Sequence, residues 1–297
     1  MGLIGAVEAG GTKFICAVGT AHDQILARET IETTNPEHTL AQCVAFFKKG
    51  ATEFGEIKKL GVAAFGPLDL KQGSPTYGAL LNTPKPGWSG FNMPKFFQEN
   101  LGFRCHIDTD VNAAVLAEVT WGAAQGCSSA VYVTIGTGIG AGVYLNGKLL
   151  HGLIHPEIGH IAVPRAEDDG VFAGVCPFHG DCLEGLASGP AVQERWGQGA
   201  ATLPQGHDAW KFEAYYLAQL CRTITLAISP ERIILGGGLM AHQTLIRLVH
   251  FQFDRLLGDY LPVSERAGGL EKYIVRESFK GVSGLAGAFA LAGEAMI

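Results

Sequence analysis

The sequence predicts an α/β protein made of two similar halves. Apolar segments of strand length alternate along the chain with stretches of helical periodicity, which is typical of this class. In addition, an arrangement of strand, glycine turn and strand over residues 3–18 returns over residues 130–145. The two glycine turns are about 126 residues apart, a period that indicates a duplicated α/β half and not a short-period repeat.

Composition excludes several classes of protein. The 297 residues leave room for two domains, and 47% hydrophobic with 17% charged residues excludes a disordered chain. The net charge of −6 provides no basic footprint for nucleic acid. No apolar run reaches the roughly 18 residues of a membrane helix, and no signal peptide is expected. We therefore expect a cytoplasmic protein whose seven cysteines stay reduced.

In the first half, a hairpin with a glycine turn is followed by helices and buried strands. Two adjacent glycines give the turn the backbone freedom that a tight loop needs. The expected strands are 3–7, 14–18, 60–65 and a segment ending at 106–108, and the expected helices are 40–47 with its flanks and 112–121. A proline-rich loop is expected over 82–90.

The second half begins with another hairpin and ends in helices. Asn146-Gly147 between apolar runs predicts the hairpin turn. Asp208 is expected to cap a long helix through about residue 228, which Pro230 ends. The other expected elements are strands 130–135, 142–145 and 232–235, a helix from about Leu239, and a Gly/Ala-rich helix over 284–295. No Ser/Pro/Gly linker separates the halves, and the boundary is expected near residue 110.

Three short glycine-rich loops, each next to an apolar strand, are candidate phosphate-binding sites. Backbone N–H groups in such turns form anion-binding nests, and glycines let a phosphate approach closely. Side chains in the first two loops add a cation and hydroxyl groups, although neither loop has the Walker A pattern. For any one loop, a tight turn without a ligand is the alternative. The residues concerned are Gly10, Gly11, Thr12 and Lys13, then Thr134, Gly136, Thr137, Gly138 and Gly140, then Gly236, Gly237 and Gly238.

Asp110 is the candidate catalytic base. It stands where a strand ends and a helix begins, and phosphoryl transfer to an alcohol needs a carboxylate that orients the hydroxyl and accepts its proton. The alternative is that Asp110 is only the N-cap of the following helix. Asp108 is a second candidate for the base, with a structural role favoured for it. Asn112 is interpreted as a first-turn residue.

Cys176, His179 and Cys182 predict a metal site. Two thiolates and an imidazole at three-residue spacing suit tetrahedral Zn²⁺, and a closed structural site needs a fourth ligand. His160 is the preferred fourth ligand, and His155 and Asp181 are the alternatives. The competing interpretation is a pair of core cysteines with a surface histidine. A metal held in this way would join the 157–160 segment to the 176–184 loop.

Two carboxylates, Glu157 and Glu184, lie on the same two segments. Carboxylates fixed by the metal can accept hydrogen bonds from several hydroxyl groups of a polyol. The alternative for each is a solvated surface glutamate.

Taken together, these segments resemble the ROK family (repressors, open reading frames and sugar kinases), in the actin-like ATPase superfamily. They occur in family order over nearly the whole chain. The matching pieces are Glu8-Ala9-Gly10-Gly11-Thr12-Lys13, Asp108-Thr109-Asp110-Val111-Asn112-Ala113-Ala114, Thr134-Ile135-Gly136-Thr137-Gly138-Ile139-Gly140, Glu157-Ile158-Gly159-His160, the Cys/His loop and Leu235-Gly236-Gly237-Gly238.

Three positions make the resemblance narrower. Glu8 replaces the Asp of many members and is typical of the fructokinase branch, and His179 replaces the Cys of many ROK glucokinases. Thr109 stands where many ROK glucokinases carry Asn, which disfavours a glucokinase. The chain therefore resembles the zinc-containing bacterial fructokinases of the family.

The resemblance implies two actin-like (ribonuclease H-like) lobes with an active-site cleft between them. The small N-terminal lobe would comprise 1–110 and the C-terminal helix 282–297, and the large lobe 111–281 with the zinc loop. In these lobes Asp110 would be the base. The residues that would bind the sugar are Glu157, Glu184, His160, Thr109 and Gly66. The phosphates would be bound by Gly10–Lys13 and Thr134–Gly138, and the nucleoside would lie near Gly236–Gly238. Zinc would be bound by His160, Cys176, His179 and Cys182.

The implied activity is phosphorylation of fructose at the 6-hydroxyl by ATP with Mg²⁺, giving fructose 6-phosphate and ADP, in a homodimer with structural Zn²⁺. A mannokinase or a broad-specificity hexose kinase is the alternative enzyme. An alternative of another class is a non-catalytic sugar-binding or regulatory ROK protein. The family's repressors carry a helix-turn-helix before the first phosphate loop, and because only about seven residues precede it here, no DNA binding is expected.

Overall fold

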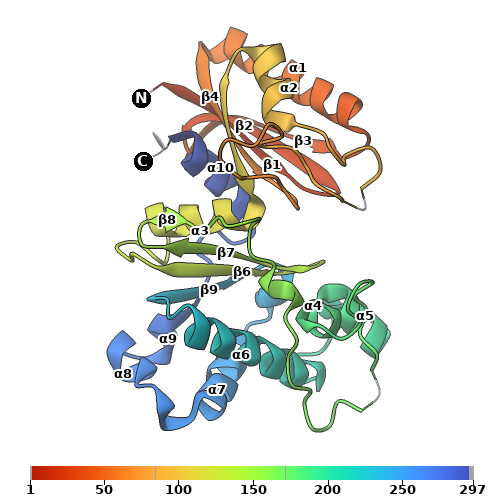
Figure 1. The fold of residues 1–297 in the computed structure, drawn as a ribbon, viewed down its shortest axis with the longest axis vertical. Helices are drawn as coiled ribbons and strands as arrows, with labels where there is room; N and C mark the ends of the chain where they lie inside the picture. The colour runs from red at the N-terminus through yellow and green to blue at the C-terminus, as the bar shows by residue number, and fades with distance from the viewer. Residues whose placement is uncertain (1, 84, 171, 294–297) are drawn as a thin grey trace. The chain divides into compact units, whose positions relative to one another are not determined.

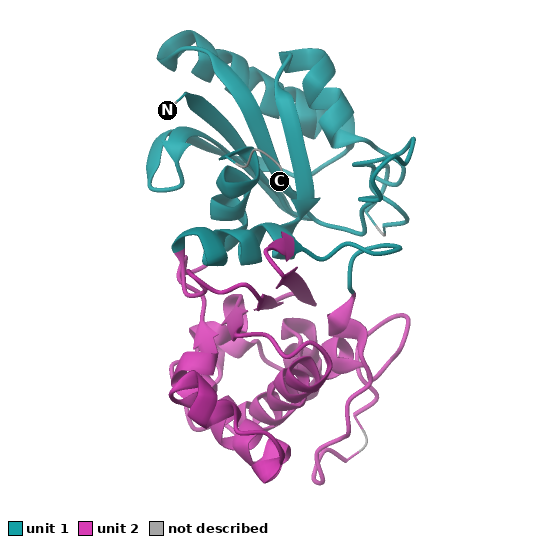
Figure 2. Cartoon of the chain, turned by 60° about the vertical axis from the view of Figure 1, so that its left-hand side comes forward, with its two compact units in different colours: residues 1–121, 149–156, 282–297 teal, residues 122–148, 157–281 magenta. Residues whose placement is uncertain are grey.

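The structure is a computed structural model that describes residues 2–83, 85–170 and 172–293. Two compact units make up the chain (Figure 2). Unit 1 contains the chain up to Trp121, the segment Leu149–Pro156 and the chain from Val282, and unit 2 contains Gly122–Lys148 and Glu157–Gly281. The expected lobe boundary at residue 110 differs from this division, because residues 111–121 pack within unit 1.

The strands of the described residues form two five-stranded sheets with the same topology (Figure 1). The order is β3-β2-β1-β4-β5 in unit 1, and β8-β7-β6-β9-β10 in unit 2 when read in the same direction. In each sheet the first strand pairs antiparallel with the second and parallel with the fourth. The duplication predicted from the two glycine turns is therefore confirmed.

Unit 1 places helices on both faces of its sheet. Helices α1 and α2 contact strands on one face, and α3 and α10 contact strands around β4 on the other. The elements are β1 (Leu3–Ala9), β2 (Lys13–Ala21), β3 (Gln24–Glu32), α1 (Pro36–Phe54), β4 (Ile57–Ala64), α2 (Met93–Leu101), β5 (Arg104–Thr109), α3 (Asp110–Trp121) and α10 (Ser283–Gly293). The expected C-terminal helix is confirmed from 283 to 293, and its last two expected residues lie outside the described residues.

An aromatic core fills the α1–α2 face. Trp88, from the expected proline-rich loop, is fully buried and its ring centroid lies 5.4 Å from that of Phe14. Its indole Nε1–H donates to the Thr34 carbonyl oxygen at 2.8 Å, which satisfies the one polar atom of the buried ring. Phe47 packs edge-on against Phe97 in the same core. The loop thus closes one end of the hydrophobic core.

The opposite face carries small residues and carboxylates. Helix α10 approaches α3 so closely that a Cβ at Gly287 would collide with the backbone of Ala113. Register pairs Glu8 with Ala63, and Ala63 with Asp108, so these three side chains point to this same face. The carboxylates of Glu8 and Asp108 therefore lie on the face of the unit 1 sheet that α3 and α10 cover.

Unit 2 surrounds its sheet with more helices. Its strands are β6 (Ala130–Ile135), β7 (Ile139–Leu145), β8 (Lys148–Leu149, whose second residue is in unit 1), β9 (Arg232–Gly236) and β10 (Ile274–Arg276). Its α-helices are α4 (Leu183–Ala187), α5 (Gly189–Trp196), α6 (Ala209–Ala227), α7 (Leu245–Leu257), α8 (Val263–Ala267) and α9 (Leu270–Tyr273). Short 3-10 turns are η1 (Ile158–His160), η2 (Ala200–Thr202), η3 (Gly238–Ala241) and η4 (Gly258–Tyr260).

One expected helix start and one expected helix cap differ from the structure. The helix expected from Leu239 is only the short turn η3, and the full helix α7 begins at Leu245. Asp208 precedes α6, but its carboxylate does not cap the helix. It pairs instead with the Lys211 ammonium at 2.7 Å, because Asp208 already has helical backbone angles that turn its side chain outward.

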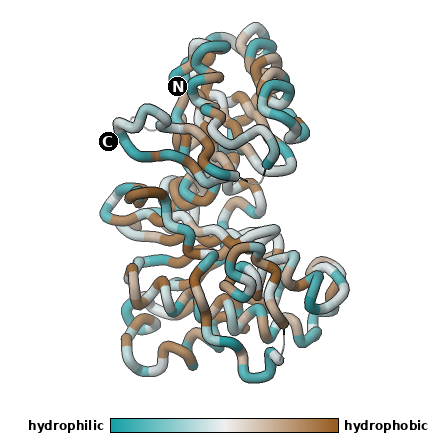
Figure 3. Tube along the Cα trace, turned by 45° about the vertical axis from the view of Figure 1, so that its right-hand side comes forward, coloured by the Kyte–Doolittle hydropathy of each residue, from teal (hydrophilic) through white to brown (hydrophobic). Residues whose placement is uncertain are grey.

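Hydropathy follows this architecture. Hydrophobic stretches run through the strands inside each unit, and hydrophilic stretches lie mainly on outer loops and turns (Figure 3). Among the described residues, none of the helices has the length and apolar character needed to cross a membrane.

Candidate functional site

The first glycine loop is a rigid, open turn between β1 and β2. The Gly10 N–H donates to the Lys13 carbonyl at 3.0 Å. Thr33, directly after β3, holds the loop by two hydrogen bonds. Its Oγ1 donates to the Gly10 carbonyl at 2.8 Å, and its N–H donates to the Thr12 carbonyl at 3.0 Å. Thr12 and Lys13 are exposed, and the space beside Gly11 is open. The loop therefore has room for an anion.

Asp110 is the first residue of α3 and not its cap. Thr109 Oγ1 accepts the Asn112 N–H at 3.1 Å, so the capping hydrogen bond belongs to Thr109. The half-buried Asp110 carboxylate accepts the N–H of Val111 at 2.9 Å. Interpreting Asp110 as a simple N-cap is thus wrong, and its carboxylate lies in the first turn of α3.

Asp108 is unsuited to be the base. It is 4% exposed, and its Oδ1 accepts the Thr109 N–H and the Asn112 side-chain amide, both at 2.8 Å. Its Oδ2 is 2.7 Å from His151 Nε2. With both oxygens engaged by donors of the protein itself, Asp108 has the structural role that the sequence favoured.

Glu8, which the sequence marked only as typical of the fructokinase branch, is a further candidate site residue. Burial, and next to it the charge of Asp110, raise the pKa of Glu8, whereas Lys13 and Arg28 lower it. Its Oε2 is buried and has no hydrogen-bond partner among the described residues. A lone carboxylate at the end of an apolar strand was the available signal. Two acidic groups and a lysine therefore surround the end of β1.

The second glycine loop joins β6 to β7 in unit 2. The Gly136 N–H donates to the Gly138 carbonyl at 2.9 Å, and the Gly189 N–H at the start of α5 donates to the Gly136 carbonyl at 2.7 Å. Glu184 reaches the end of the loop, where its Oε2 accepts the Ile139 N–H at 2.9 Å. Thr137 is exposed at the tip. Glu184 is thus part of the loop's support.

The third loop follows β9 and is held by Glu277, a residue that the sequence did not reveal. The Glu277 carboxylate accepts the Tyr132 hydroxyl at 2.8 Å, the Gly237 N–H at 3.4 Å and the Gly281 N–H at 3.1 Å. Side-chain atoms of Tyr132 and Glu277 fill the space beside Gly236, while the space beside Gly238 is open.

Four predicted metal ligands come together in unit 2. The ligand atoms of His160, Cys176, His179 and Cys182 all lie within 4.8 Å of one another. His160 Nδ1 is 3.7 Å from Cys176 Sγ and 3.5 Å from Cys182 Sγ, and His179 Nδ1 is 3.7 Å from Cys176 Sγ. Zinc bonds of about 2.3 Å to sulfur and 2.0 Å to nitrogen place tetrahedral neighbours about 3.6 Å apart. The cluster therefore fits a tetrahedral metal ion.

The two alternative fourth ligands lie elsewhere. His155 belongs to unit 1, where its Nε2 accepts the Leu68 N–H at 3.1 Å and its ring lies beside Gly66. Asp181 forms an ion pair with the Arg165 guanidinium at 3.2 Å. His160 is consequently the fourth member of the cluster.

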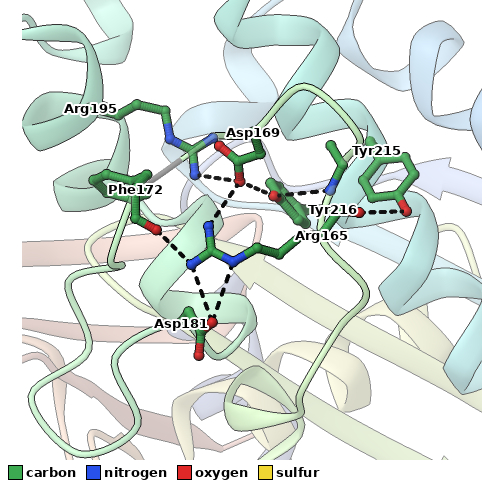
Figure 4. Close-up of polar contacts among 8 residues, drawn as sticks. Arg165, Asp169, Phe172, Asp181, Arg195, Tyr215 and Tyr216 are labelled. Carbon is green, nitrogen blue, oxygen red and sulfur yellow. Dashed lines mark hydrogen bonds and ion pairs between the residues drawn. The ribbon is translucent and has the colours of Figure 1, made fainter.

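A polar network holds the segment around Arg165 and Asp169, which leads to the loop that contains Cys176, His179 and Cys182 (Figure 4). This loop is called the metal loop below. The buried Asp169 carboxylate accepts the Tyr216 hydroxyl and an Arg195 N–H at 3.2 Å, and lies 3.6 Å from Arg165. Arg165 also reaches Asp181, next to the candidate ligand Cys182. The network thus connects α5 and α6 with the metal loop.

Glu157 directly precedes the short turn η1, which ends at His160 and packs on β7. A side chain at Gly159 would collide with the Ile139 carbonyl oxygen, so only glycine allows this approach. Glu157 is exposed. His160 presents Nδ1 to the cysteines and Nε2 to Glu184 Oε1, 3.9 Å away. One imidazole therefore faces both the metal cluster and a candidate sugar ligand.

The structure assembles the predicted site residues into one group in each unit. Unit 1 gathers its group around the ends of β1, β4 and β5, and unit 2 gathers the other around two glycine loops and the metal cluster. The unit 1 group is Gly10–Lys13, Gly66, Thr109 and Asp110, and the unit 2 group is Thr134–Gly138, Glu157, His160, Cys176, His179, Cys182, Glu184 and Gly236–Gly238.

Known proteins resemble the chain over nearly its full length. It is 43% identical to the fructokinase of Zymomonas mobilis subsp. mobilis over 293 residues, 98% of this chain and 96% of that protein. It is 36% identical to the fructokinase of Pediococcus pentosaceus over 294 residues, 99% of each. The fold is similar to that of a ROK hexokinase from Thermus thermophilus, with a TM-score of 0.76, 24% identity and 98% of each chain covered. The sequence pattern of the ROK family matches residues 4–295, and the chain belongs to the ROK family.

Proposed function

We propose that the protein is an ATP-dependent fructokinase. The C6 hydroxyl oxygen of fructose forms a bond to the γ-phosphorus of ATP, the bond from that phosphorus to the β,γ-bridging oxygen breaks, and fructose 6-phosphate and ADP leave. The observation that carries the proposal is the full-length similarity to fructokinases from several bacteria, combined with an Asp at the end of β5.

Asp110 takes the hydroxyl proton in this proposal. Its half-buried carboxylate is held at the start of α3, so one oxygen is fixed by the Val111 N–H. A base held in one orientation lowers the entropic barrier to in-line attack.

Several side chains are assigned to sugar hydroxyl groups. Glu184 and His160 supply an acceptor and a ring nitrogen that lie close to each other, and Glu157 directly precedes the turn that ends at His160. In unit 1, Thr109 keeps a hydroxyl hydrogen to donate, because its oxygen only accepts in the helix cap. Gly66 offers backbone groups at the end of β4.

Phosphates are assigned to Gly10–Lys13 and Thr134–Gly138, with the nucleoside near Gly236–Gly238. The open space beside Gly11, Gly136 and Gly238 supports this assignment, since a Cβ there would meet nothing within 4 Å. Lys13 and the loop N–H groups would stabilise charge on the transferring phosphoryl group. Mg²⁺, when bound with ATP, supplies further neutralisation of phosphate charge.

Zinc is assigned to His160, Cys176, His179 and Cys182. Four protein ligands leave no open position, so the metal would have a structural role. It would hold η1, which ends at His160 and directly follows Glu157, against the loop before Glu184.

The test is ADP release with Mg-ATP and fructose, mannose, glucose, N-acetylmannosamine or no sugar. We expect turnover with fructose to exceed turnover with every other sugar. Equal turnover with mannose would replace the proposal with a broad hexose kinase. Zinc-loaded protein that turns over none of these sugars would refute it and favour a non-catalytic sugar-binding protein.

A further inference from the structure

The buried Asp108 carboxylate is the centre of a hydrogen-bond network in unit 1 that reaches out to the partly exposed His151. It receives the Thr109 N–H and the Asn112 amide on Oδ1, each at 2.8 Å, and His151 Nε2 on Oδ2 at 2.7 Å. Asn112 also donates its own N–H to Thr109 Oγ1. Hydrogen bonds therefore connect Asp108 and Thr109, which precede Asp110, with Asn112, which follows it. These bonds hold the turn that carries Asp110.

His151 completes this network from a distant part of the chain, 43 residues away from Asp108. Its partner is an acceptor, so Nε2 carries a hydrogen. The hydrogen bond to Asp108 raises the pKa of His151 against the opposing effect of burial. Asp108 and Asn112 are the groups that contact the ring, and Asp108 is the one charged group among them. The short distance is typical of a charge-assisted hydrogen bond.

The segment Leu149–Pro156 is fastened to unit 1 by two histidines with opposite roles. His151 donates to Asp108, whereas His155 Nε2 accepts the N–H of Leu68. Between these two histidines the segment is exposed to solvent, and the Leu153 side chain is 87% exposed. The segment is thus held at a donor and an acceptor and not by an apolar core of its own.

We propose that His151 is a positioning residue for phosphoryl transfer, acting through Asp108 to fix the turn that carries Asp110. The inference rests on the proposed role of Asp110 as base. Without the donor from His151, Oδ2 of Asp108 loses its partner, and the turn is held only by the two hydrogen bonds that Oδ1 accepts from Thr109 and Asn112. A base displaced by about 1 Å loses up to about 100-fold in rate.

The first experiment compares His151→Leu, which has no donor, with His151→Gln, whose amide keeps one. We expect kcat of His151→Leu with fructose to fall about 10- to 100-fold with KM values for fructose and ATP within about twofold of wild type. His151→Gln is expected to recover most of kcat. His38→Leu, an exposed histidine on α1, is the matched control and is expected to keep full kcat.

The second experiment is a double-mutant cycle with Asp110→Asn. If His151 acts through the base, His151→Leu adds little to the loss already caused by Asp110→Asn. Fully multiplicative losses would refute the inference, and so would an unchanged kcat in folded His151→Leu. If His151→Leu does not fold, His151→Ala takes its place as the variant without a donor: a loss of kcat that His151→Gln recovers supports the inference, and an unchanged kcat in folded His151→Ala refutes it.

Wild-type activity separates this inference from the proposed function. A wild-type protein without kinase activity refutes the proposed function. An active wild type whose Asp110→Asn variant keeps its kcat refutes the base assignment and the inference with it. An active wild type with a dependence on Asp110 but none on His151 refutes the inference alone.

Discussion

Glu184 and His160 lie 3.9 Å apart, with the carboxylate Oε1 facing the imidazole Nε2. The other Glu184 oxygen accepts the Ile139 N–H, and the other His160 nitrogen faces two cysteine thiols. The pair therefore links the second glycine loop with the metal cluster. At 3.9 Å the two atoms form no hydrogen bond, but the carboxylate charge lies close to the outer nitrogen of a candidate metal ligand. Sugar recognition and metal binding are thus expected to depend on each other.

Removing the proposed base tests the chemistry directly. We expect Asp110→Asn to lower kcat by about 100- to 10,000-fold, because an amide accepts no proton at neutral pH. Binding of ATP and zinc content should remain. Asp23→Asn, at an exposed position between β2 and β3, is the control and should be as active as wild type. Near-normal turnover of Asp110→Asn would show that another group takes the proton.

Loss of a cysteine tests the metal cluster. Cys182→Ser is expected to weaken zinc binding more than about 100-fold, since loss of an outer hydrogen-bond partner alone costs about 10- to 100-fold. The melting temperature should fall and become insensitive to a chelator. Cys127→Ser, whose half-buried thiol lies outside the cluster, should behave as wild type. Metal analysis of the purified variants provides the measurement, and equal zinc in both variants would contradict the assignment.

The polar network of Figure 4 is expected to govern metal retention as well as stability. Asp169→Asn leaves Arg195 and Arg165 without their buried counter-charge, so we expect about 3 to 5 kcal/mol of lost stability. Zinc should also leave faster, because Arg165 connects Asp169 with Asp181 in the metal loop. Asp168→Asn at the adjacent exposed position is the control. Urea unfolding and zinc release to a chromogenic chelator measure the two effects.

The buried carboxyl of Glu213 predicts a pH dependence of stability. Glu213 is 2% exposed, and burial raises its pKa well above the usual value of 4.5, although Arg195 opposes this. The folded protein therefore holds a proton that the unfolded chain releases, and its stability decreases as pH rises from 4.5 toward the folded-state pKa.

Glu213→Gln removes this titration. We expect its free energy of unfolding to exceed that of wild type near neutral pH, and the difference to shrink toward pH 4.5. The change is at most about 1.4 kcal/mol per pH unit, which corresponds to one proton. Glu194→Gln, exposed on α5, should show no such trend. A pH-independent difference between wild type and Glu213→Gln would contradict the assignment of a protonated carboxyl.

Local patterns in the sequence determined the repeated architecture and most of the candidate site. Strand and turn periodicity depends on neighbouring residues, and the two glycine turns therefore predicted two similar α/β halves, which the structure shows as two sheets of equal topology. The three-residue spacing of Cys176, His179 and Cys182 likewise predicted a metal cluster, because ligands so close in sequence need only one loop to converge. His160 was found through its place in the neighbouring Glu-Ile-Gly-His segment.

Only the tertiary structure decided the contacts between distant segments. Asp108 meets His151 because the chain returns to unit 1 after β8, and nothing in the local pattern of either residue encodes that return. Helix α3 belongs to unit 1 because the small residues of α10 pack against it, which moves the boundary beyond residue 110. The raised pKa of Glu8 depends in the same way on burial and on the approach of Asp110. Such contacts depend on the packing of whole elements, and their free energy becomes available only once the sheet has formed.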